Sequence, residues 1–100
     1  MKIKSSSKSR ALVAHDNDNV ATALNSIPKA NRLALLREDG FTSEVTAIED
    51  IPLGHKIATK RISRGEKVIK YGEVIGVATE DISLGSHVHV HNVNSLRGKK

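Results

Sequence analysis

Cysteine is absent from this chain of 100 residues. Its absence excludes a disulfide framework, a zinc–thiolate site and a cysteine nucleophile. Phe41 is the only phenylalanine, Tyr71 is the only tyrosine and tryptophan is absent, so the core must be aliphatic. No apolar run approaches the roughly 20 residues of a membrane-spanning helix, and the N-terminus lacks the apolar stretch of a secretory signal. We therefore expect a cytoplasmic protein without a membrane partner.

Negative charge is the scarcer sign, with a formal net charge of +5, but the positive excess lies at the two ends. Between Ala11 and Leu96, nine basic residues stand against all 11 acidic residues. The body of the chain is thus slightly acidic, and aromatic side chains on which bases could stack are almost lacking. This distribution favours solvated tails on a near-neutral domain over a nucleic-acid partner.

The chain divides into a short tail and one domain. Residues 1–10 (MKIKSSSKSR) are serine-rich and basic, a composition typical of disorder. Residues 11–98 have the length of a single small domain. Because a domain of this size buries little apolar surface, contact with a partner chain, or with a second copy in a homo-oligomer, would add stability.

One helix is predicted near the start of the domain, from Val20 to Ser26. Residues 11–15 form a short apolar segment that we expect to be a strand, and residues 16–19 (DNDN) are of types that cap helices. Apolar residues then recur at helical spacing, and Pro28 ends the element because residues before proline avoid helical angles.

The rest of the domain is predicted to be β structure. Past Leu33, runs of valine and isoleucine interrupted by glycine indicate short strands and tight turns. We expect these strands over residues 41–47, 56–60, 67–70, 74–78 and 87–93.

An internal repeat is the strongest structural signal. Residues 47–54 (AIEDIPLG) recur as residues 78–85 (ATEDISLG), identical at six of eight positions. A looser pattern, in which glycine follows isoleucine by three positions, also starts at Ile62, and Ile27 starts a further copy with Ala30 in place of the glycine. Each copy predicts a turn in which the glycine has a positive φ and the flanking aliphatic side chains enter the core.

Five histidines are the most reactive side chains. Three of them, His87, His89 and His91, alternate with valines, and strand geometry would place their imidazoles on one face. Imidazole is a common metal ligand and titrates near neutral pH. The alternative interpretation is an exposed polar face on an edge strand.

Three further polar segments allow both a functional and a structural interpretation. Residues 15–19 either bind an oxygen-rich anion or cap a helix. Residues 54–56 (GHK) either bind a carboxylate or form a solvated turn. Residues 71–76 (YGEVIG) form a turn in which Tyr71 either donates a hydrogen bond to a ligand or packs locally; the segment lacks the lysine and hydroxyl residue of a phosphate loop.

Four motifs in order resemble the N-terminal domain of the altronate and galactarate dehydratases. They are HxxDNVA from His15, IPxGHK from Ile51, YGEVIG from Tyr71 and HxHN from His89. The resemblance covers roughly residues 15–98. That domain belongs to the SAF group, whose fold is the β-clip, so the resemblance and the helical segment together predict a mainly β, SAF-type β-clip domain with one short helix.

The resemblance implies a lyase. In this family the domain is either fused to a large catalytic domain or is a separate small subunit. The expected function is the small subunit of a metal-dependent hydro-lyase that dehydrates a sugar acid, contributing one wall of an active site shared with a large catalytic subunit. The metal of the assembled enzyme would be iron or manganese, not necessarily held by this chain alone. The alternatives are the small subunit of sulfolactate sulfo-lyase and a non-catalytic carbohydrate- or anion-binding SAF module.

The family motifs also imply roles for individual residues. The expected catalytic residues are His15, His55, Lys56 and Tyr71. The expected contacts to the substrate are Asp18, Asn19, Gly72 and Asn92. The expected metal ligands are His15, His89 and His91. The motif match does not clearly include His87, which we expect to be a surface residue.

Overall fold

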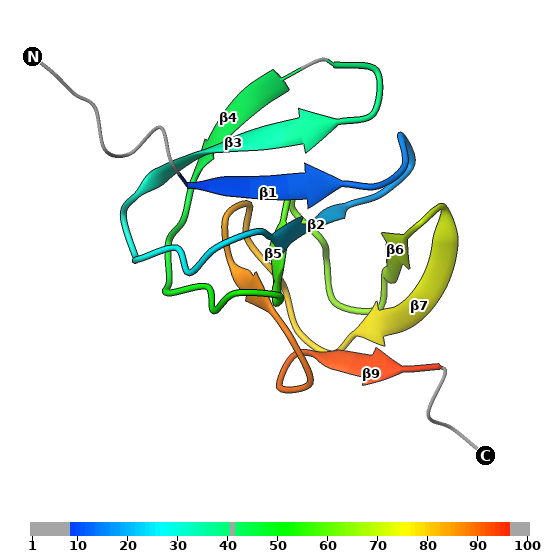
Figure 1. Ribbon diagram of the computed structural model, residues 1–100. Coiled ribbons are helices and arrows are strands. Elements are labelled where there is room, and N and C mark those ends of the chain that lie inside the picture. The colour runs from blue at the N-terminus through cyan, green and yellow to red at the C-terminus, as the bar shows by residue number, and fades with distance from the viewer. Residues whose placement is uncertain (1–8, 41, 97–100) are drawn as a thin grey trace, which may run out of the picture.

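The computed structural model describes residues 9–40 and 42–96, so the predicted tail up to Lys8 and the last two residues of the predicted domain lie outside the described part. Within these described residues, nine strands form a six-stranded sheet with the order β4-β3-β1-β2-β5-β8 and a three-stranded sheet with the order β6-β7-β9 (Figure 1). In the part of the chain that the structure describes, no helix is long and apolar enough to cross a membrane. The prediction of a mainly β fold is confirmed. The strands are β1 Arg10–Val13, β2 Val20–Ala23, β3 Arg32–Arg37, β4 Thr42–Thr46, β5 Lys56–Ala58, β6 Lys67–Lys70, β7 Glu73–Ala78, β8 His87–Val88 and β9 Val93–Ser95.

The predicted helix from Val20 to Ser26 is wrong, because this segment contains strand β2. β2 lies between β1 and β5 and pairs antiparallel with both. Its side chains are buried on both faces, with Val20 in one core cluster and Ala21 and Ala23 in the other. A short run that is apolar on all sides carries no usable periodicity, and a helix of two turns gains too little to outweigh pairing with two strands.

The other strand predictions are confirmed in position, with two exceptions. The predictions omitted β3, which pairs parallel with β1 and antiparallel with β4. The predicted strand over residues 87–93 is wrong in extent, because β8 ends at Val88 and a turn leads to β9.

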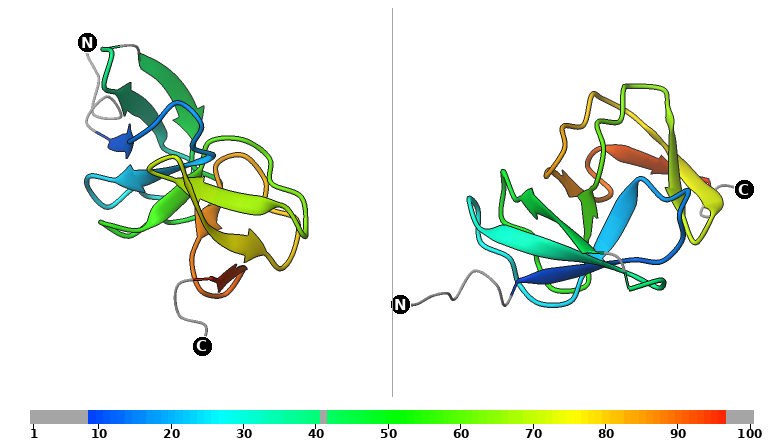
Figure 2. Two further views of the ribbon diagram at one scale, coloured as in Figure 1. Left: turned by 90° about the vertical axis from the view of Figure 1, so that its right-hand side faces the viewer. Right: turned by 90° about the horizontal axis from the view of Figure 1, so that it is seen from above.

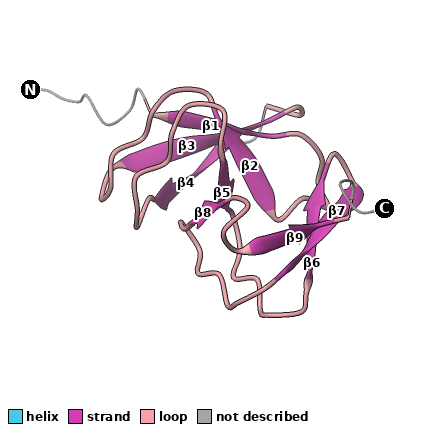
Figure 3. Ribbon diagram, turned by 90° about the horizontal axis from the view of Figure 1, so that it is seen from below, coloured by secondary structure: helices cyan, strands magenta, loops and turns pink. Residues whose placement is uncertain are grey.

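Two aliphatic clusters make up the core. One contains side chains of the six-stranded sheet such as Leu33 and Ile57, and the other lies between β2, β5 and the three-stranded sheet around Ile62 and Val68. Figure 2 shows the smaller sheet against one end of the larger one, and Figure 3 shows that loops make up much of the path between strands. Asn19 joins the sheets, because its side chain donates to the Lys67 carbonyl and accepts from the Ile69 amide.

The repeated turns pair with one another. Ile27 and Ile51 exchange two backbone hydrogen bonds of 2.8 Å each, and Ile62 and Ile82 exchange an equivalent pair of 2.8 and 2.7 Å. All four isoleucine side chains are buried. Each of the two core clusters thus contains one pair of isoleucine turns, which confirms that the repeat sets turns and core.

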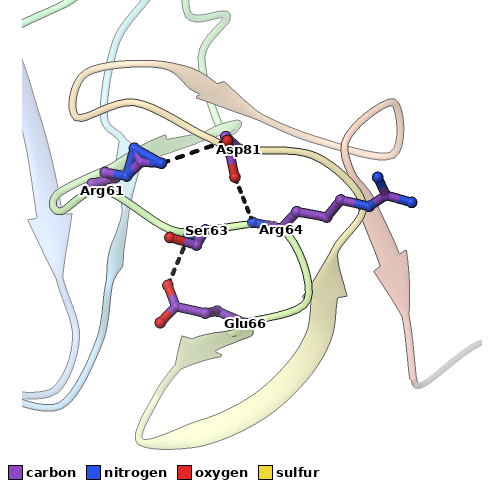
Figure 4. Close-up of polar contacts among 5 residues, drawn as sticks. All are labelled: Arg61, Ser63, Arg64, Glu66 and Asp81. Carbon is purple, nitrogen blue, oxygen red and sulfur yellow. Dashed lines mark hydrogen bonds and ion pairs between the residues drawn. The ribbon is translucent and has the colours of Figure 1, made fainter.

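The aspartate that recurs in the two longest repeat copies binds the backbone of the turn that pairs with its own. Asp50 accepts from the Lys29 amide and Asp81 from the Arg64 amide, both at 2.8 Å. Figure 4 shows the second of these turns, in which Glu66 also accepts from the Ser63 amide. The repeated aspartates therefore have a structural role.

Candidate functional site

The turn at Tyr71 and Gly72 is fixed by the motif that begins at His15. Asp18 is 2% exposed, and its two carboxylate oxygens accept from the Tyr71 amide at 3.0 Å and the Gly72 amide at 2.8 Å. These bonds hold Tyr71 at a φ of +58°, unusual for a non-glycine residue. The His15 ring packs so closely on this turn that a Cβ at residue 72 would lie 3.0 Å from it. This contact and the φ of +74° at residue 72 both favour glycine there.

A second polar side chain shapes the segment of alternating histidines. Asn92 is 4% exposed; its oxygen accepts from the His89 amide at 3.0 Å, and its nitrogen donates to the His87 carbonyl at 2.9 Å. These bonds convert the segment into a turn after Val88, which is why the predicted continuous strand does not form. Glu49 adds a further contact, because its carboxylate accepts from the His87 amide at 2.7 Å.

Three imidazoles stack where β5 and β8 pair. His55 immediately precedes β5, His87 begins β8, and His89 follows it. The His55 ring centroid lies 5.0 Å from that of His87 and 4.1 Å from that of His89, with nearly parallel planes. Nδ1 of His55 and Nε2 of His87 are 2.8 Å apart, so one nitrogen donates a hydrogen bond to the other. We call His55, His87 and His89 the histidine cluster.

His87 and His89 of the histidine cluster favour the neutral imidazole. The pKa of His87 is lowered, first by burial and then by the neighbouring histidines, against a smaller opposing effect of Glu49. Burial likewise lowers the pKa of His89, followed by the nearby charges of His55, Lys56 and His91. A ring without a proton on one nitrogen can accept a proton or bind a metal ion.

A pocket of about 320 Å³ adjoins the histidine cluster. Burial, and then the charge of Lys70, lowers the pKa of Lys56. The Lys70 ammonium also lies over the Tyr71 ring, 5.0 Å from its centroid, in a cation–π contact. We call this the lysine pocket, and its lining residues are Lys56, Lys70, Tyr71, Ile75, His89, Val90, Val93 and Ser95.

The lysine pocket combines cationic and apolar walls. Two lysines and one tyrosine hydroxyl offer charge and hydrogen bonds to an anion, while valine and isoleucine side chains exclude water beside them. Tyr71 is 65% exposed and Val90 is 79% exposed, so the rim of the pocket faces solvent. The geometry suits a small organic anion that is only partly enclosed by this chain.

The predicted site residues fall into separate groups. His55, Lys56, Tyr71 and His89 lie at the histidine cluster or the lysine pocket. His15 is exposed beside Gly72, with Nδ1 accepting from the Asn17 amide, and His91 is exposed with its ring 5.2 Å from that of His87. Among the described residues, the one group of three or more potential ligands within 4.8 Å is the histidine cluster.

Three residues that were predicted to contact the substrate form hydrogen bonds to backbone groups with their polar side-chain atoms. Asp18 holds the Tyr71 turn, Asn19 bridges the sheets, and Asn92 closes the His89 turn. Sequence reasoning assigned no role to Lys70 and placed His87 on the surface. The signal for His87 was the alternation of histidines, whereas no motif pointed to Lys70.

Comparison with known proteins agrees with the motifs. The family model described as the altronate/galactarate dehydratase SAF domain matches residues 9–96. Altronate dehydratase of Bacillus subtilis (strain 168) is 44% identical over 81 residues, which is 81% of this chain and 15% of that protein. Galactarate dehydratase (L-threo-forming) of Escherichia coli (strain K12) is 39% identical over 74 residues, which is 74% of this chain and 13% of that protein.

A shorter relative is similar along almost its whole length. Subunit alpha of (2R)-sulfolactate sulfo-lyase of Paracoccus pantotrophus is 43% identical over 65 residues, which is 65% of this chain and 97% of that subunit. The fold and these matches define a SAF-type β-clip domain. The chain belongs to the altronate/galactarate dehydratase SAF family, and it spans only about 15% of the length of the dehydratases that it matches.

Proposed function

We propose that this chain is the small subunit of a hydro-lyase that dehydrates a sugar acid of the altronate or galactarate type. The lysine pocket carries the proposal, because a sugar acid offers a carboxylate to Lys70 and hydroxyl groups to Lys56 and Tyr71. The dehydratase relatives support the reaction class by name. As in the sequence-based prediction, the setting is cytoplasmic.

The chain contributes one wall of an active site that a large catalytic subunit completes. The exposed rim at Tyr71 and Val90 supports this, since a partner surface placed there would enclose the ligand and exclude water. The short sulfo-lyase relative is a subunit by its printed name, which supports a separate small chain. We expect no turnover by this chain alone.

Within this wall, binding and proton transfer fall to different side chains. Dehydration requires removal of a proton next to a carboxylate and protonation of a leaving hydroxyl. Lys70 binds the carboxylate as a cation. Lys56, whose pKa is lowered, exchanges protons with the substrate more readily than an ordinary lysine, and His89, whose pKa is also lowered, does so when its ring binds no metal ion. His55 and His15 are proposed to assist, His55 through its contact with His89 and His15 through the Tyr71 turn.

The histidine cluster fits part of the expected metal chemistry. Its donors are three imidazoles without a carboxylate, a set that suits iron and is poor for manganese. A divalent ion bound there would supply charge stabilisation to the developing enolate. His55, His87 and His89 would hold it, rather than the set of His15, His89 and His91 expected from the motifs.

One specific observation favours a second candidate. The match covers 97% of a sulfo-lyase subunit alpha but 15% of an altronate dehydratase, so the similarity extends over nearly the whole of the subunit. A sulfonate would occupy the lysine pocket as readily as a carboxylate. A non-catalytic anion-binding module is the outcome if no partner confers turnover.

The test is co-purification with the large subunit encoded nearest to this chain, followed by assays with altronate, galactarate and (2R)-sulfolactate. We expect turnover of one acid by the pair and none by this chain alone. Replacing Lys70 by methionine should lower kcat/KM about 10–100-fold, which corresponds to the loss of one charged hydrogen bond. The matched control is Lys60→Met, since Lys60 is exposed outside the pocket. Turnover by the chain alone, or an unaffected Lys70 variant, would refute the proposal.

A further inference from the structure

We infer that the histidine cluster binds one divalent transition metal ion within this chain alone, and that the ion is of the nitrogen-preferring class represented by Zn²⁺ rather than Mn²⁺ or Mg²⁺. The observation behind it is that one ring nitrogen from each of His55, His87 and His89 lies within 4.8 Å of the other two. The inference rests on this donor set and not on the proposed reaction.

Strand pairing and one buried side chain position the three histidines of the cluster. β5 and β8 pair antiparallel, with Ile57 opposite His87, so His55 just before β5 and His89 just after β8 are carried to the same place. Asn92 fixes the turn that presents His89. A site whose ligands are placed by strand pairing and a buried side chain needs little ordering when the ion binds.

The three rings must adjust before they can coordinate one ion. Two nitrogens on a tetrahedral ion with bonds of about 2.0–2.1 Å lie about 3.3 Å apart, whereas Nδ1 of His55 and Nε2 of His87 are 2.8 Å apart. Because the planes are nearly parallel, the rings must also turn about χ2 so that their lone pairs converge. That torsion is broad in histidine, so the ion replaces one hydrogen bond with three coordinate bonds.

The donor types decide the class of ion. Imidazole nitrogens suit Zn²⁺, Ni²⁺, Cu²⁺ and Fe²⁺, whereas Mn²⁺ and Mg²⁺ prefer carboxylate and water oxygens. One candidate oxygen ligand, the Glu49 carboxylate, already accepts a hydrogen bond from the His87 amide. Three protein ligands leave a position open on a four-coordinate ion. Since His89 also lines the lysine pocket, the ion would lie beside the place proposed for the acid.

The experiment is a calorimetric titration of the full chain, purified without a polyhistidine tag, with Zn²⁺ and in parallel with Mn²⁺. We expect one equivalent of Zn²⁺ to bind at least about tenfold more tightly than Mn²⁺. Alanine at His55, His87 or His89 should weaken Zn²⁺ binding by about 10–100-fold or more. His15→Ala and His91→Ala are the matched controls and should bind as the wild type does.

A second measurement requires no variant and so does not depend on folding of the mutants. Addition of paramagnetic Ni²⁺ should broaden the imidazole NMR signals of the histidine cluster first and that of His15 last. Absence of a saturable site for one Zn²⁺ overturns the inference. So does loss of binding in the His15 and His91 variants with binding retained in the His87 variant. Neither measurement needs a partner subunit or a substrate, so failure here is distinguishable from failure of the proposed function.

Discussion

Replacing Ala30 by glycine should stabilise the protein. Ala30 stands where the other repeat copies have glycine, and its φ is +76°, close to the +88° of Gly65 at the equivalent turn. The two turns share a backbone bond, from the Ala30 amide to the Ala47 carbonyl and from the Gly65 amide to the Ala78 carbonyl. The fold thus imposes a left-handed conformation on an L-residue at position 30.

The size of the effect follows from two opposing contributions. Relief of the left-handed conformation gains about 1–2 kcal/mol, and the greater freedom of glycine in the unfolded chain costs about 0.4–1 kcal/mol. Ala30 is exposed, so its methyl group contributes little burial. We expect a net gain of roughly 0.5–1 kcal/mol, which raises Tm by about 2–8 °C for a domain of this size.

The assay is urea and thermal unfolding of Ala30→Gly beside two controls. Gly65→Ala should lose stability by a similar amount, since a Cβ there meets nothing within 4 Å and only the φ of +88° opposes it. Lys29→Gly, in the same turn but without a positive φ, should be destabilising. If Ala30→Gly were destabilising to the same extent as Lys29→Gly, the argument from turn geometry would fail.

Three further outcomes are expected. Asp18→Ala should lower the free energy of unfolding by about 2–3 kcal/mol, because it removes two hydrogen bonds to a buried carboxylate; unchanged stability with lost turnover of the assembled enzyme would instead assign Asp18 to substrate binding. Lys70→Met should raise the pKa of Lys56 in an NMR titration, since one of its two causes is removed, and an unchanged pKa would leave burial as the only cause. Stability to urea should fall as the pH drops below 6.5, because folding lowers the pKa of His87 and His89 from that value and the unfolded chain binds more protons; the same slope in a variant with glutamine at both positions would contradict this.

The turns and strands were predictable where one local pattern decided the structure. The isoleucine–glycine spacing predicted four turns, and even the copy with Ala30 adopts the glycine conformation. The segment from Val20 was not predictable in the same way, because its alanines satisfy a helix and a doubly buried strand equally. Pairing with β1 and β5 decided between them, and that pairing joins residues far apart in the chain.

The site was predictable in part for the same reason. Family motifs pointed to His55, Lys56 and His89, which do lie together. The alternation of histidines also favoured a common location for His87 and His89, although the strand from which it was argued ends at Val88. The structure brings those two rings to a centroid distance of 5.5 Å through a turn. Side-chain bonds from Asn92 to the backbone decide that turn, and no periodicity reveals them.

The two longest copies of the internal repeat differ in the residues that follow them, and these residues lie at the candidate site. Each of the two longest copies ends on a glycine, and the residues that follow are His55-Lys56 in the first copy and Ser86-His87 in the second. Among the shared residues, the alanines and isoleucines fill the core and the aspartates close turns, so the fold requires them. The residue pairs that differ between the copies, His55-Lys56 and Ser86-His87, are not constrained in this way. Because β5 and β8 pair antiparallel, with Ile57 opposite His87, these two pairs lie close together. The repeated turn therefore supplies the scaffold, and the residues that differ just after it include the lysine and the two histidines of the proposed site.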